Sequence, residues 1–244
     1  MDSPDVHELL DAARRYEEEG KVLHAGQVYW RLLKAAPDLE EPYLRLSSIF
    51  LEEGHAEEAE RMLRRGARNC PDSTQCLTML GDHLLRRSDY NGALECLAPL
   101  MSKKLPQVHV RVAVALLHLG KMAGAEREIR KALTLDSRLP QAREILGEIL
   151  LATQRPAEAA AELKRALRID PYNGRAHRLL GQAYLRNRNL REALDAFQMA
   201  VNLDPLDARA WHSCGEVLLR LRRLNEAELC LHRALDLDPQ SAET

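Results

Sequence analysis

The chain of 244 residues contains few aromatic residues and no long hydrophobic run. Phe, Trp and Tyr together make up 4% of the sequence, and no segment alternates Val, Ile or Thr with polar residues in the way that predicts β-strands. No apolar stretch approaches the ~18 residues that would predict a transmembrane helix, so we expect no membrane insertion. The net charge is only −2, which argues against nucleic acid as the main ligand.

Catalytic and metal-binding motifs are also missing from the sequence. The nine histidines lack metal-ligand spacing, and neither His-Glu-x-x-His nor a Gly-rich phosphate loop occurs. The five cysteines favour free thiols over disulfides, although Cys70 and Cys76 flank one turn and could meet. We therefore expect no enzyme activity, no cofactor and no metal. The acidic and polar first residues do not form a secretory signal, which predicts a cytoplasmic protein, or a periplasmic one if a leader has been removed.

What the sequence does contain is a pattern with a period of about 34 residues. Prolines that would end a helix recur at Pro37, Pro71, Pro171, Pro205 and Pro239. A small residue recurs in the second half of each unit, at Ala25, Ala59, Ala93, Ala125, Ala159, Ala193 and Ala227. Another recurs in the first half, at Ala13, Ser47, Gly81, Ala113, Gly147, Gly181 and Gly215. Glycine inside a helix costs ~1 kcal/mol, so these positions predict closely packed helix pairs in a stacked array.

This pattern resembles the tetratricopeptide-repeat (TPR) family. The family skeleton Trp-Leu-Gly-Tyr, Ala, Phe, Ala, Pro is matched most fully by Leu180, Gly181, Tyr184, Ala193, Phe197, Ala200 and Pro205. The resemblance covers residues 6–241 and implies an all-α fold, a right-handed α-solenoid or superhelix of about seven helix-turn-helix repeats. We place the repeats at 6–39, 40–73, 74–105, 106–139, 140–173, 174–207 and 208–241, with a cap segment at 1–5 and a tail at 242–244. The Ala-, Arg-, Leu- and Glu-rich repeats suggest a bacterial protein.

The third repeat departs from this pattern. Pro99 falls inside its second helix, where proline removes a backbone hydrogen bond and should interrupt the helix. The repeat is also two residues shorter than the others. This is either a tolerated irregularity or a hinge between repeats 1–3 and 4–7.

The resemblance implies a non-enzymatic scaffold or adaptor that binds a protein or peptide partner. In the family the first helix of each pair lines a concave groove, so we expect the binding residues there. One equivalent position in these helices, which we call the leucine phase, is nearly always leucine: Leu51, Leu85, Leu117, Leu151, Leu185 and Leu219. This predicts either packing between helices or an apolar track for a ligand. Nearby apolar positions are Leu44, Met79, Val110 and Val114. Repeats five to seven add Glu148, Arg175, Arg178, Gln182, Arg209, His212 and Glu216. We expect an extended or helical peptide, apolar in its middle and acidic towards the C-terminal repeats.

The two ends of the array favour a second interpretation. Residues 1–73 hold 16 acidic and 10 basic side chains, whereas the remainder holds 21 acidic and 25 basic ones. The last predicted helix leaves Leu229, Cys230 and Leu237 as its expected outer apolar residues, with no cap over them. The chain could therefore be a structural protein that forms a homo-oligomer through its ends. A third alternative is the TPR regulatory part of a larger enzyme.

Overall fold

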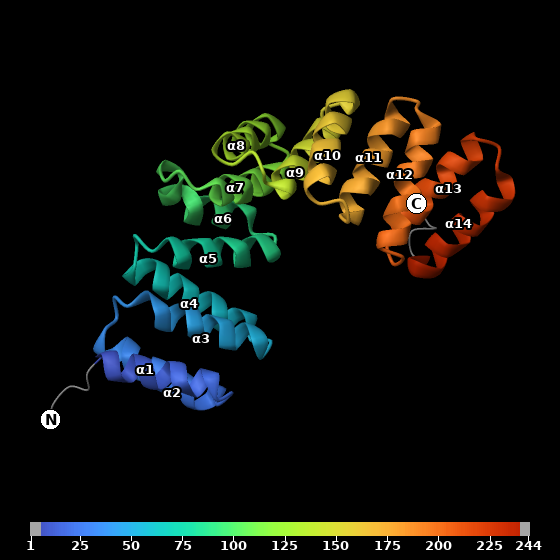
Figure 1. Ribbon diagram of the computed structural model, residues 1–244. Helices are drawn as coiled ribbons and strands as arrows, with labels where there is room; N and C mark the ends of the chain where they lie inside the picture. Colours follow the sequence, from blue (N-terminus) through green and yellow to red (C-terminus); the bar gives the residue numbers. More distant parts are fainter. Residues whose placement is uncertain (1–5, 240–244) are drawn as a thin grey trace. The chain divides into compact units, whose positions relative to one another are not determined.

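The computed structural model describes residues 6–239, which form fourteen α-helices, one 3-10 helix and no β-strand (Figure 1). The all-α prediction is therefore confirmed for this part of the chain. The predicted cap segment at 1–5 and tail at 242–244 lie outside the described residues. The helices are α1 (Val6–Glu18), α2 (Val22–Ala35), α3 (Glu40–Glu52), α4 (Ala56–Asn69), α5 (Thr74–Arg86), α6 (Tyr90–Leu97), η1 (Ala98–Ser102), α7 (Pro106–His118), α8 (Met122–Leu135), α9 (Pro140–Ala152), α10 (Pro156–Ile169), α11 (Gly174–Arg186), α12 (Leu190–Leu203), α13 (Ala208–Arg220) and α14 (Leu224–Leu237).

Pro99 interrupts the second helix of the third repeat, as its position in the sequence predicts. Helix α6 ends at Leu97 after only eight residues, and the 3-10 helix η1 carries the chain across Pro99. The other second helices, such as α4 and α12, run for fourteen residues. The missing N–H and the fixed φ of proline account for the shortened helix.

The recurring small residues allow one helix of a pair to lie against the backbone of the other. A Cβ atom added at Gly147 would lie 2.6 Å from Cγ of Leu163, and one added at Gly181 would lie 2.7 Å from the ring of Phe197. Both Leu163 and Phe197 are fully buried. The bulky side chain of the second helix therefore occupies the space that a larger residue in the first helix would need.

The turn between the two helices of a repeat contains one residue in the left-handed region. Gly20 has φ 70° at this place in the first repeat, and the Lys21 N–H donates to the Tyr16 carbonyl, 2.8 Å away, to close the helix. Ser88 occupies the corresponding place after α5 with φ 61°, although serine lacks the conformational freedom of glycine there.

Contacts divide the chain into two compact units, and the boundary between Ala115 and Leu116 lies within α7. In unit 1, the first helices α3 and α5 contact each other directly; in unit 2, α11 contacts both α9 and α13. The second helices described here do not approach one another to the same extent within either unit. Successive repeats contact each other mainly through the second helix of one and the first helix of the next, and their first helices also touch. We call the face made by the odd-numbered helices of each unit its inner face.

Candidate functional site

The inner face of unit 2 is crossed by ion pairs that join α9 to α11. Arg175 of α11 lies 2.6 Å from Glu148 and 3.1 Å from Glu144. The Glu144 side chain is only 7% exposed, and it also accepts a hydrogen bond from Nδ2 of Asn173, at 2.9 Å. Two donors therefore compensate the buried carboxylate, which would otherwise be costly to desolvate.

The next junction, between α11 and α13, has a different charge. Arg178 lies 2.8 Å from Asp207, whose other carboxylate oxygen accepts the Ala210 N–H at the start of α13. Counted from the small residues Gly181 and Gly215, Arg209 corresponds to Arg175 of the preceding repeat.

The residues opposite that position have changed. The positions equivalent to Glu144 and Glu148 in the next repeat hold Arg178 and Gln182. His212, which follows Arg209 by one turn on α13, is exposed. The α11–α13 junction therefore carries an excess of positive charge, whereas the α9–α11 junction sets two carboxylates against one arginine.

The inner face of unit 1 is also joined by ion pairs, and these leave little net charge. Arg14 of α1 makes two hydrogen bonds with Glu41 of α3, at 2.9 and 2.6 Å. Arg111 makes two with Asp82 of α5, at 2.6 and 2.7 Å. Such two-point contacts fix the guanidinium group geometrically as well as electrostatically.

The leucine phase of the first helices is half-buried in most repeats. Leu44, Met79 and Leu85 pack against one buried cluster of unit 1, and Leu185 packs against a cluster of unit 2. These side chains pack between helices, as one interpretation predicts, and keep an exposed edge; their contact with a ligand stays a prediction. The partly exposed members of the predicted set are Leu44, Leu51, Met79, Leu85, Val114, Leu117 and Leu185.

Six residues predicted to contact a ligand are buried or paired within the chain. Val110 and Leu151 are 3% and 4% exposed, so they offer almost no surface to a ligand. Four charged residues form ion pairs inside the chain, and their contact with a ligand stays a prediction: Glu148, Arg175, Arg178 and Glu216, the last with Arg220 at 2.7 Å. Periodicity identifies the face on which a residue lies, but it does not reveal the partner that a charge meets one repeat away.

Sequence reasoning also missed residues outside the helices. Asn173 and Asp207 cap α11 and α13 by accepting hydrogen bonds from Ala176 and Ala210, and each also contacts the inner face. The sequence contains a signal for both residues, because Asn and Asp are preferred immediately before a helix.

A hollow lies on unit 2 over α13, between α12 and α14. Its lining includes Gln198, Trp211, Leu229 and Cys230. The Cys230 Sγ lies 3.9 Å from Sγ of Cys214, and all five cysteines of the chain are free. Burial, together with the neighbouring Cys230, raises the pKa of the Cys214 thiol to about 12, so this thiol is a poor nucleophile.

The described residues contain no obvious place for a metal or for membrane insertion. No group of three or more His, Cys, Asp or Glu side chains within 6–239 could hold an ion. No helix in the same range is both long and apolar enough to cross a bilayer.

Comparisons with known proteins identify the repeats. Three family models, each described as tetratricopeptide repeat, match residues 78–140 and 113–174, residues 150–214, and residues 208–241. A search of curated proteins finds no match to this chain.

Similar solved structures support the same fold. PilF of Pseudomonas aeruginosa has a TM-score of 0.72 and 19% identity over 84% of this chain and 94% of that one. A chain of the APC/C hetero-tetramer Cut9–Hcn1 has a TM-score of 0.75 and 16% identity, over 93% of this chain but only 46% of its own length. YrrB, described as a TPR protein with an unusual peptide-binding site, has a TM-score of 0.51 and 17% identity over 87% and 93% of the two chains.

Proposed function

Because this chain belongs to the tetratricopeptide-repeat family, we propose that it is a non-enzymatic scaffold that binds a segment of a partner protein on the inner face of unit 2. Two of the similar structures are consistent with such a role, since one is described with a peptide-binding site and the other with a protein partner. Their identities of 16% and 17% concern the fold alone, so the case for this site rests on its own residues.

The observation that carries the proposal is the change of charge between two successive junctions. At the first, Arg175 contacts two carboxylates; at the second, Arg178 and Gln182 replace them opposite Arg209. Stacking of repeats does not need this change, because the preceding junction is joined by Arg175 and two carboxylates. A ligand carboxylate beside Arg209 and His212 would supply the negative charge that the junction lacks.

An apolar contact would accompany this charge. Leu185 lies near the C-terminal end of α11 and keeps part of its side chain exposed. A peptide that places an acidic residue at Arg209 could rest a hydrophobic side chain there, in an extended or a helical conformation.

The ion pairs of the inner face favour binding without rearrangement. Arg178 is held by Asp207, and the Arg186 guanidinium donates to the Leu151 carbonyl at the end of α9. Side chains fixed in this way lose little further conformational entropy when a ligand arrives.

The test is selection of peptides from a random displayed library by the purified chain, followed by affinity measurement. The selected peptides should share an acidic residue. The variant Arg209→Glu with His212→Glu should bind them at least about tenfold more weakly, because attraction becomes repulsion. The matched control is Arg191→Glu, which reverses an exposed charge on α12 and should leave affinity unchanged.

A photo-crosslinking residue distinguishes the inner face from the hollow over α13. Placed at Gln182 of α11 it should capture a selected peptide, whereas placed at Gln198, in the hollow, it should not. Circular dichroism verifies that each variant remains helical. Capture at Gln198 alone, or equal loss of affinity in the Arg191 control, would refute the proposed site.

A further inference from the structure

The last helix pair presents an apolar face at the C-terminal end of unit 2. A shallow hollow there is lined by Leu219 of α13 and by Leu224, Glu228, Leu231, His232 and Leu235 of α14. Leu224 is 60% exposed, and Leu219 and Leu235 are 45% and 41% exposed. Several exposed leucines on one side of a helix indicate an interaction surface. The predicted outer residues Leu229 and Cys230 lie instead in the hollow over α13.

The preceding repeat shows what this face normally contacts. The positions 34 residues before Glu228, Leu231 and Leu235 hold Leu194, Phe197 and Val201, and all three are buried. Leu194 and Phe197 share a cluster with Val217 of α13, and Val201 shares one with Ala210. The leucines at the end of unit 2 thus occupy the surface on which a further helix would pack.

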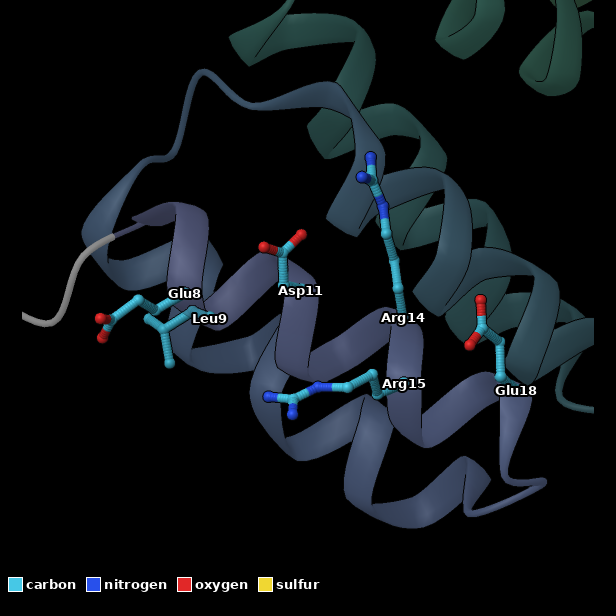
Figure 2. A pocket seen from close by; sticks show the side chains of 6 residues that line it. All are labelled: Glu8, Leu9, Asp11, Arg14, Arg15 and Glu18. Carbon is cyan, nitrogen blue, oxygen red and sulfur yellow. The ribbon is translucent and has the colours of Figure 1, made fainter.

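The N-terminal end of the array has a different chemistry. Counted from Ala13 and Gly215, Glu8 and Arg15 of α1 correspond to Ala210 and Val217 of α13, both fully buried. Glu8 and Arg15 are exposed, and Figure 2 shows them pointing away from α3, whereas Arg14 extends towards it. Head-to-tail stacking of copies would bury these two charges in place of apolar residues, at a large desolvation cost. An N-terminal end of a second copy is therefore a poor occupant of the C-terminal face.

We propose that the partner of the C-terminal face is the same face of a second copy, with the two α14 helices antiparallel across a two-fold axis. The residues that line the face along α14 are 224, 228, 231 and 235, spaced by four, three and four. Three of these positions hold leucine and one holds Glu228; spacings of four and three residues are those of a helix–helix seam, and the order is the same in both directions. Pairing about its centre sets Leu224 against Leu235 of the second copy, twice in the dimer.

The charged residues of the face fit the same arrangement. Glu228 and His232 lie on one side of α14, 3.8 Å apart within one helix. In this register Glu228 of each copy faces Leu231 of the other, and His232 of that copy lies beside Leu231 at the edge of the contact. A carboxylate beside an imidazole at symmetric positions makes a surface complementary to itself, whereas two exposed leucines alone would accept many partners.

Sedimentation velocity of the full chain from about 1 µM to 1 mM tests the proposal, since interfaces of this limited size are weak. We expect a reversible dimer. Leu224→Glu should raise the dissociation constant at least about 100-fold, because each of two identical contacts loses about tenfold. The control Leu229→Glu changes a leucine on the same helix that is 71% exposed but lies off the seam, and it should dimerise like the wild type. A chain that stays monomeric at 1 mM, or loses dimerisation equally in both variants, overturns the proposal.

A mixing experiment tests the antiparallel register. Glu228→Lys and His232→Glu should each weaken the homodimer, because the first removes the carboxylate beside His232 and the second sets two carboxylates close together across the axis. An equimolar mixture should form a heterodimer at least about fivefold tighter than either homodimer, since the lysine introduced in one variant meets the glutamate introduced in the other. Equal affinities in the mixture and the separate variants would exclude this register. Circular dichroism of each variant separates a lost interface from a lost fold.

Discussion

Glycine-to-alanine substitution at two helix positions should change the stability of the chain in opposite directions. Gly26 lies in α2 and Gly181 in α11, both within helices. Alanine is favoured over glycine inside a helix by ~1 kcal/mol, so propensity alone predicts that both variants are stabilised. The surroundings of the new methyl group decide whether that gain survives.

At Gly26 the gain should survive. The nearest atom to an added Cβ is Cδ2 of Leu46, at 4.0 Å, an ordinary van der Waals distance. At Gly181 three ring atoms of Phe197 lie within 2.9 Å, and the ring is fully buried. Such overpacking costs ~1–3 kcal/mol, which exceeds the gain in propensity. We expect Gly26→Ala to stabilise by up to ~1 kcal/mol and Gly181→Ala to destabilise by up to ~2 kcal/mol.

Urea unfolding followed by circular dichroism measures both changes. Repeat arrays depart from two-state unfolding, so the curves should be fitted with nearest-neighbour coupling between repeats. Hydrogen exchange provides a local measurement, in which Gly181→Ala should lower protection in α11 and α12. If Gly181→Ala were as stabilising as Gly26→Ala, the argument that small residues are required for close packing would be wrong.

Three further outcomes follow from buried polar groups. Burial lowers the pKa of His83 despite nearby Glu60, so the unfolded state binds a proton first as the pH falls below ~6.5. The free energy of unfolding should therefore decrease from pH 7.5 to 5.5, and it should decrease much less in the variant His83→Gln. Urea unfolding at each pH measures both changes. Arg175→Leu should lower the free energy of unfolding by ~1–2 kcal/mol at pH 7. The loss should be smaller in combination with Glu144→Gln, because the double variant no longer buries a carboxylate without its cation. A double-mutant cycle measures the difference. Cys214 should react with iodoacetamide at pH 8 far more slowly than a free thiol, and rapid alkylation in the folded state would contradict its burial and raised pKa.

The fold could be predicted from the sequence because its main determinants are local and periodic. Gly147 and Gly181 mark positions where only a small residue fits, and Pro99 marks the interrupted helix; each acts through its own backbone or a neighbour in the same repeat. For the inner face, the sequence predicts only which side of each first helix contributes to it. Whether a residue there is available depends on a partner almost one repeat away, as for Arg175 with Glu148, and on burial, as for Leu151.

The ion pairs between repeats also bear on how the order of the repeats is maintained. In α1 and α3 a base precedes an acid, Arg14 with Glu41, whereas in α9 and α11 an acid precedes a base, Glu148 with Arg175. The four helices that carry these pairs, α1, α3, α9 and α11, are each 13 residues long, so side chains rather than helix length distinguish a correct neighbour from a wrong one. Stacking the first repeat on the sixth would bring Arg14 against Arg175, and stacking the fifth on the second would bring Glu148 against Glu41. Copies that arise by duplication can thus diverge in charge before they diverge in shape, and a rearranged gene that joined them in another order would encode repulsion at the new junction.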